Sequence, residues 1–196
     1  AVDELLPHVD AYKVASYELM WDALLEACAK TGKPVILSCG MATLEEVHHA
    51  AGVLRRAGAK NVTLLHTISA YPTPVEEANL AAMETICNAT GFPCGWSDHT
   101  VSAGVILRAV GRWQAPMVEF HLDLDKSGAE YAAGHCWLPE QMAPVIAMVR
   151  DGERADGDGL KRALPSELPD RDWRADPSDG LRPLKHIRRT YRGEAA

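Results

Sequence analysis

The chain alternates short apolar runs with longer amphipathic segments. The apolar runs have four or five residues and little alternation, which is typical of strands buried on both faces of a parallel sheet. They cover residues 12–16, 34–38, 62–66, 93–96 and 117–121. In the other segments apolar residues recur at helical spacing, and glycines close several of them. This pattern predicts helices over residues 18–31, 43–57, 79–90, 102–111 and 139–150.

Repetition of a strand followed by a helix predicts an α/β protein of the (β/α)8 barrel type. A doubly wound sheet is the competing fold, but it usually carries a glycine-rich phosphate-binding turn after its first strand. The chain has no such turn, and polar residues follow each predicted strand, where barrel enzymes place their active sites. About five of eight units are recognisable. We therefore expect a partial barrel over residues 1–150, with the first three strands missing.

Composition narrows the possible partners. The net charge of −7 argues against nucleic acid as a partner, because phosphate backbones require a basic surface. The sequence has no run of about 18 apolar residues, so it predicts no membrane span, and the first residues do not resemble a signal peptide. The five cysteines form no Cys-x-x-Cys pair, so we expect reduced thiols in a cytoplasmic protein. Asp, Gly, Arg and Pro dominate residues 151–196, which predicts an extended, polar C-terminal arm or linker.

Two histidines follow neighbouring predicted strands. His99 comes after Ser97 and Asp98, and His121 comes two residues after Glu119. Strands that neighbour in a sheet lie about 4.8 Å apart, so both imidazoles can reach one divalent ion. Two hydrogen-bonded histidines without a metal are the alternative. Imidazole with carboxylate and water suits an ion such as manganese better than a closed tetrahedral zinc site.

Hydroxyls and a lysine follow the same strand ends. Ser16, Ser38 and Ser97 can donate to a phosphate, and Lys13 can supply positive charge. Single serines at strand ends are more often structural, but three beside a lysine favour an anion site.

Two glutamates and a tyrosine complete the candidate residues. Glu119 and Glu18 are candidate acid–base or hydroxyl-binding groups, and each can instead be half of a buried ion pair. Tyr71 can pack on a sugar or close the core.

The ordered motifs resemble the N-acetylneuraminate (sialic acid) synthase family over roughly residues 11–150. They are Lys13-Val-Ala-Ser-x-Glu18, Gly32-Lys-Pro-Val-Ile-Leu-Ser-Cys-Gly-Met-Ala-Thr43, Leu65-His-x-x-x-x-Tyr-Pro-Thr-Pro74, Gly95-x-Ser-Asp-His-Thr100 and Glu119-x-His121. The resemblance implies a (β/α)8 barrel followed by a small antifreeze-like domain. It also implies condensation of phosphoenolpyruvate with an N-acylated amino sugar such as N-acetylmannosamine, giving a nine-carbon 2-keto acid and phosphate.

The resemblance also implies roles for individual residues. Phosphoenolpyruvate would be held by Lys13, Ser16, Ser38 and Ser97. The divalent metal would be bound by His99 and His121, with manganese expected and magnesium or cobalt as alternatives. The sugar and the reacting carbons would be surrounded by Glu18, Ser69, Tyr71 and Glu119, of which Glu119 and Glu18 are the catalytic candidates.

The sequence departs from the family pattern in the loop after the last predicted strand. The family usually carries Gly-Pro-Asp there, and its aspartate holds the sugar, whereas this chain has Tyr131-Ala-Ala-Gly-His-Cys-Trp137. Two alternatives stay open: a related keto-deoxy sugar acid synthase, and a truncated, non-catalytic remnant that binds metal or a partner chain. Because a partial barrel has open edges, we also expect oligomerisation, most simply a homodimer.

Overall fold

The computed structural model describes residues 1–191. Within this range the chain forms two compact units, residues 1–155 and residues 156–191. The first unit contains a parallel sheet of six strands. They are β1 (Tyr12–Val14), β2 (Val35–Ser38), β3 (Val62–His66), β4 (Cys94–Asp98), β5 (Val118–Leu122) and β6 (Cys136–Trp137). All neighbouring pairs are parallel, and the spatial order is the sequence order, β1 to β6. The predicted α/β class is therefore confirmed.

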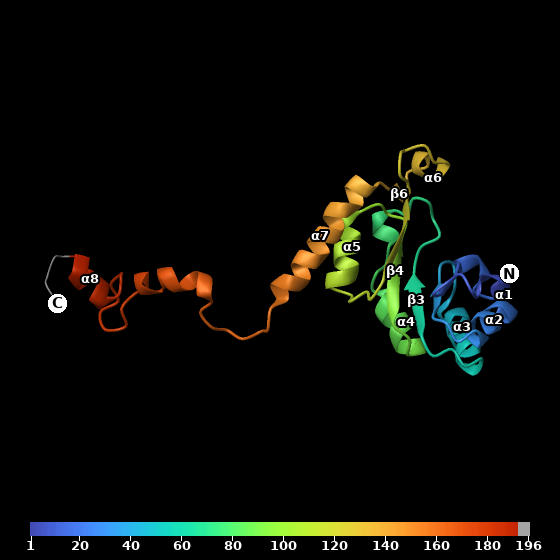
Figure 1. Ribbon diagram of the computed structural model, residues 1–196, viewed down its shortest axis with the longest axis horizontal. Coiled ribbons are helices and arrows are strands. Elements are labelled where there is room, and N and C mark those ends of the chain that lie inside the picture. The colour runs from blue at the N-terminus through green and yellow to red at the C-terminus, as the bar shows by residue number, and fades with distance from the viewer. Residues whose placement is uncertain (192–196) are drawn as a thin grey trace. The chain divides into compact units, whose positions relative to one another are not determined.

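The sequential strand order excludes a doubly wound sheet, in which the order reverses part-way. In Figure 1 the colour changes from blue at α1 through green at β4 to yellow at β6 and orange at α7. In a flat sheet, four strand spacings would separate β1 from β5 by about 19 Å. Lys13 at β1 nevertheless lies 3.3 Å from Glu119 on β5, measured from Nζ to Oε1. The sheet is thus curled into a half-barrel.

Helices connect the strands close to where the sequence predicts them. They are α1 (Val2–Leu5), α2 (Asp22–Lys30), α3 (Leu44–Arg56), α4 (Ala82–Thr90), α5 (Ala103–Gly111), α6 (Ala129–Ala132) and α7 (Pro139–Asp156), with single 3-10 turns η1 (Ser16–Glu18) and η2 (Val75–Glu77). Thr43 and Glu46 form the expected capping box at the start of α3. Gly91 ends α4 in the left-handed conformation, with φ of 71°.

The core lies between the sheet and its helices. Leu25 of α2 and Leu54 of α3 are fully buried, as are Leu37, Leu64 and Trp96 on successive strands. Apolar residues from both kinds of element thus fix the strands from one side. This packing leaves the polar strand ends free to form a site.

Two parts of the chain differ from the sequence-based expectation. The sequence predicts five strands and a plain polar loop after the fifth, but this region contains α6 and the short strand β6. The arm after Asp151 is predicted to be extended, whereas α7 continues to Asp156 and the second unit forms η3 (Pro165–Trp173) and α8 (Lys185–Tyr191). In that unit Arg188 donates to both carboxylate oxygens of Asp179, at 2.7 Å each. Local ion pairing therefore organises part of this polar segment.

Two further expectations can be compared with the structure. All five cysteines are free thiols. Over residues 1–191, every helix is too short or too polar to cross a membrane.

Candidate functional site

A cavity of about 340 Å³ opens where the carboxyl ends of the strands meet. Eight of the ten residues predicted for the site line it: Lys13, Ser16, Ser38, Tyr71, Ser97, His99, Glu119 and His121. They come from elements as far apart as β1 and β5. The curled sheet thus brings together residues that are distant in sequence.

Lys13, Glu119 and Ser97 form one connected group. The Lys13 ammonium lies 3.3 Å from Glu119 Oε1, and the Ser97 hydroxyl donates to Glu119 Oε2 at 2.8 Å. The register of β4 and β5, which pairs Ser97 with Glu119, explains the second contact. Both partners of the ion pair are about a third exposed, at 32% and 38%, so the pair faces the cavity rather than the core. Glu119 is therefore held in place by two partners and oriented toward the site, although an ion pair was the alternative interpretation of this residue.

Serine hydroxyls gather on the β1–β3 side of the cavity. The Ser16 hydroxyl accepts a hydrogen bond of 2.9 Å from the Gly40 amide. A side chain at Gly40 would place its Cβ 2.3 Å from Ser69 Oγ and 2.9 Å from Ser16 Oγ, so only glycine leaves room for both hydroxyls. The hydroxyls of Ser38 and Ser69 are buried without a hydrogen-bond partner in the described chain. Buried donors of this kind are rare unless a ligand satisfies them.

Two predicted residues do not line the cavity. Glu18 ends η1 and is half-buried, and Ser69 lies behind Gly40. Among the described residues, neither belongs to the cavity lining. Their assignment to the sugar-binding region stays a prediction.

His99 is prepared to act as a neutral ligand. Its Nδ1 donates to the Ile68 carbonyl at 2.8 Å, which leaves the Nε2 lone pair free. Burial lowers the pKa of His99, partly offset by that carbonyl, so the neutral imidazole is favoured. The ring of Tyr71 packs 4.2 Å from the His99 ring, and His121 lies 5.1 Å from it, edge to face. The two predicted ligands are therefore neighbours.

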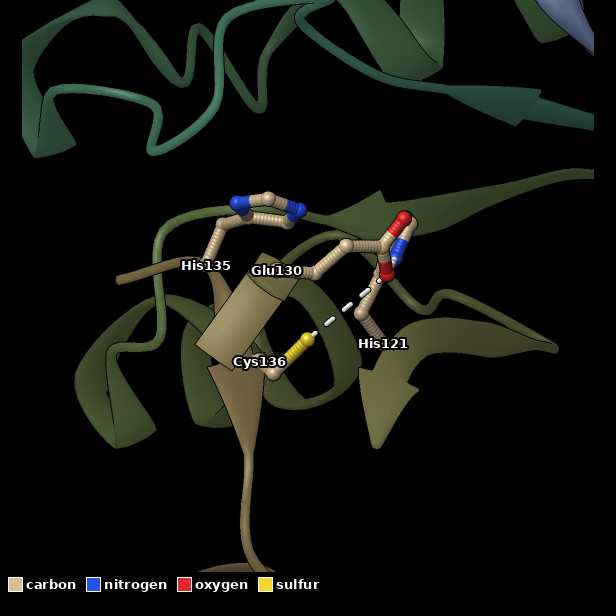
Figure 2. A group of neighbouring side chains, drawn as sticks. All are labelled: His121, Glu130, His135 and Cys136. Carbon is tan, nitrogen blue, oxygen red and sulfur yellow. Dashed lines mark hydrogen bonds and ion pairs between the residues drawn. The ribbon is translucent and has the colours of Figure 1, made fainter. Parts of the chain in front are cut away.

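A second set of side chains surrounds His121. Its members are His121, Glu130, His135 and Cys136, and their ligand atoms all lie within 4.8 Å of one another (Figure 2). Such a group can hold a metal ion. Glu130, His135 and Cys136 were not among the predicted site residues. The signal that could have found them is Glu-x4-His-Cys, located after a strand that ends in histidine.

Asp98 plays a different part from its neighbours. Its side chain is fully buried and accepts hydrogen bonds from the indoles of Trp96 and Trp137, at 3.0 and 2.9 Å. It also accepts from Thr100 and from the Val101 amide. The carboxylate is thus satisfied by hydrogen bonds within the fold.

Comparisons with known proteins agree with this geometry. An uncharacterized protein of Methanocaldococcus jannaschii is 42% identical over 164 residues, which is 82% of this chain and 47% of that protein. An N,N'-diacetyllegionaminic acid synthase of Campylobacter jejuni is 39% identical over 160 residues, covering 80% of this chain and 47% of the relative. The chain therefore spans about half the length of these relatives.

Solved structures show the same likeness. The crystal structure of N-acetylneuraminic acid (sialic acid) synthetase from Leptospira borgpetersenii, in complex with citrate, superposes with a TM-score of 0.70 and 29% identity. The match covers 88% of this chain and 60% of that one. The model of the NeuB family matches residues 1–161. With most of its length matched by that model, this chain belongs to the NeuB family.

Proposed function

We propose that this chain supplies the catalytic strand ends of a sialic-acid-type synthase. The reaction joins phosphoenolpyruvate to the aldehyde of an N-acyl amino sugar, such as N-acetylmannosamine, and consumes one water. Its products are a nine-carbon 2-keto acid and inorganic phosphate. The family assignment and the relatives named as legionaminic and sialic acid synthases support this proposal. The names of the relatives refer to different sugars, so of the two substrates the identity of the sugar is less constrained than that of phosphoenolpyruvate.

One observation carries the proposal: a lysine and three serine hydroxyls face a common cavity. Lys13 supplies positive charge, and the buried Ser38 hydroxyl has no hydrogen-bond partner within residues 1–191. A phosphate monoester offers several strong acceptor oxygens for such donors. Phosphoenolpyruvate bound by Lys13, Ser16, Ser38 and Ser97 would therefore give the Ser38 hydroxyl the partner that it lacks among the described residues.

Glu119 is suited to orient substrate and move a proton. Its carboxylate is fixed by Lys13 and Ser97, so it can accept a hydrogen bond from a sugar hydroxyl or from the attacking water without reorganising. Glu18 is proposed as a second carboxylate at the edge of the site. Ser69 and Tyr71 are proposed to contact the sugar, and the exposed ring of Tyr71 offers a flat apolar face for it.

His99 and His121 fit a divalent metal, with manganese as the expected ion. When bound, the ion supplies Lewis-acid polarisation of the sugar carbonyl. His99 contributes a neutral imidazole whose orientation is set by the Ile68 carbonyl. We expect a cytoplasmic enzyme that works as a homodimer, consistent with its reduced thiols and with biosynthetic chemistry on small molecules.

The proposal is tested by incubating the protein with phosphoenolpyruvate, manganese and a panel of N-acyl amino sugars. Phosphate release and formation of a 2-keto acid are expected with at least one sugar. Lys13→Met should raise the KM for phosphoenolpyruvate strongly. The matched control is Lys30→Met, because Lys30 is a surface lysine paired with Glu26 of the same helix. Absence of phosphate release with every sugar, from protein shown to be folded, contradicts the proposal.

A further inference from the structure

We propose that Glu130 and His135, from the loop between β5 and β6, are metal ligands together with His121. Glu130 and His135 add one carboxylate and one imidazole to the pair of His121 and His99, whose rings lie 5.1 Å apart. This inference deepens the proposed function at its metal, but metal binding itself can be measured without the reaction.

The first argument comes from the burial of His135, whose Nδ1 has no hydrogen-bond partner among the described residues. The residue is only 6% exposed, and its Nδ1 makes no hydrogen bond within residues 1–191. The ring packs 5.1 Å from both the Tyr71 and the His121 rings. In Figure 2 the ring nitrogen farther from Cβ, Nε2, is turned toward Glu130 and His121, and Nδ1 lies on the other side of the ring. The ring thus presents Nε2 to the cluster, where a metal ion can bind it.

Distances are the second argument. His121 Nδ1 and Glu130 Oε2 are 2.9 Å apart and share a hydrogen bond. Two atoms bound to one ion at about 2.1 Å lie roughly 3.0 Å apart when adjacent and 4.2 Å apart when opposite. The ligand atoms of the whole cluster lie within 4.8 Å of one another, so side-chain rotations without movement of the backbone can bring them to one ion. The ion would replace the proton that His121 and Glu130 now share.

The loop is also ordered in a way that presents these ligands. Asp123 accepts backbone hydrogen bonds from Asp125, Lys126 and Gly128, at 3.0, 2.6 and 2.9 Å. These bonds fix the turn that leads into α6, which carries Glu130. Beyond α6, the pairing of β5 with β6 sets His121 opposite Cys136, next to His135. Two independent constraints thus hold the three ligands together.

Cys136 is assigned a positioning role rather than coordination. Its sulfur lies 3.8 Å from Glu130 Oε2 and donates its proton there. Without a thiolate, the ligand set has only nitrogen and oxygen atoms, which suits manganese, iron(II) or cobalt(II) and leaves positions open for substrate oxygen.

Metal affinity of the purified chain tests the inference. Titration with Mn²⁺ in a calorimeter is expected to show one site, with affinity lowered at least about 10-fold in Glu130→Gln and in His135→Gln. Matched controls are Glu140→Gln and His48→Gln, exposed residues of the same types outside the cluster. Circular dichroism in EDTA verifies folding. Because the Glu130 side chain is 63% exposed, its substitution leaves the core intact even if the His135 variant fails to fold.

Cobalt(II) substitution tests the role of Cys136. The spectrum should lack a thiolate-to-cobalt charge-transfer band, and Cys136→Ser should leave it unchanged. Such a band would overturn the ligand assignment, as would wild-type affinity in Glu130→Gln, or a wild-type chain that binds neither ion. Failure of the reaction with metal bound would instead contradict the proposed function alone.

Discussion

The indole nitrogen of Trp137 donates a hydrogen bond of 2.9 Å to the buried carboxylate of Asp98. Trp137 belongs to β6 and Asp98 to β4, two strands that do not pair directly with each other. Asp98 also accepts from Trp96, so two tryptophans converge on one carboxylate behind the site histidines. This hydrogen bond connects the last strand, and the loop before it, to the centre of the sheet.

Removal of the Asp98 carboxylate should destabilise the fold. Asp98→Ala leaves two buried indole donors unpaired, and each unsatisfied buried group costs about 1–3 kcal/mol. We expect a loss of at least about 2 kcal/mol in the free energy of unfolding, measured by urea denaturation. Asp151→Ala, on the exposed face of α7, is the control and should change little. Equal midpoints for the two variants would contradict the structural role of Asp98.

Gly95 is expected to be required by the close approach of β4 to the segment before β5. A Cβ at this position would lie 2.3 Å from the Met117 carbonyl oxygen, and backbone cannot move aside as a flexible side chain can. Gly95→Ala should therefore lower the thermal midpoint by several degrees, consistent with a loss of about 2 kcal/mol.

Gly111 provides the matched control for that substitution. It lies in α5, and an added Cβ would meet nothing within 4 Å. Gly111→Ala should leave stability unchanged or raise it by up to about 1 kcal/mol, because alanine favours the helix. If Gly95→Ala behaves like Gly111→Ala in differential scanning calorimetry, the close approach is not a constraint.

The phosphate site predicts a difference between two serines. Ser38→Ala removes a buried hydroxyl that has no hydrogen-bond partner within residues 1–191, so it should leave the free energy of unfolding nearly unchanged or raise it slightly. The same substitution should weaken binding of phosphoenolpyruvate. Ser97→Ala should affect both properties, because Ser97 also holds Glu119. Urea denaturation and the KM for phosphoenolpyruvate together separate the two effects. An unchanged KM in Ser38→Ala would contradict the role of Ser38 in binding phosphoenolpyruvate.

Buried His66 predicts how stability varies with pH. Burial lowers the pKa of His66, and the Ala78 carbonyl that accepts from its Nε2 at 3.1 Å only partly offsets this effect. In the unfolded chain the ring takes up a proton near pH 6.5, whereas in the folded chain it stays neutral to lower pH. The unfolded state therefore binds more protons, and stability should fall as pH drops below about 6.5.

Urea denaturation between pH 7.5 and pH 5 measures that slope. It should become shallower in His66→Gln, because the variant has no proton to gain at this position. His48→Gln, which changes an exposed histidine, should keep the wild-type slope. A His66→Gln slope as steep as the wild type would show that other groups determine the pH dependence.

The sequence predicts the strands well because each is an apolar run bounded by turn residues. Val62–His66 is a strand at the predicted residues, and α3 begins at its predicted capping box. The polar strand ends also predict eight of the cavity-lining residues, since parallel strands place their carboxyl ends at one edge. Local pattern and topology are sufficient for this part of the molecule.

Strand β6 and the cluster around His121 depend on contacts that the local pattern does not contain. Cys136 and Trp137 are too few to show a strand period, and they form a strand because β5 lies alongside and Asp98 receives the indole. Glu130 and His135 lie in a segment that is polar and irregular in sequence. Their approach to His121 follows from the order that Asp123 imposes on the loop.

The contact between Lys13 and Glu119 has a consequence for the energetics of folding. Its two strands are separated in the sheet by three others, so the pair can form only after the intervening β-α units have assembled. A ligand that touches both residues would bind the assembled state alone and would stabilise it by mass action, by about 2.7 kcal/mol at a concentration 100 times its Kd. Substrate bound to both residues would then connect β1 to β5, and its presence would slow the unfolding of the half-barrel.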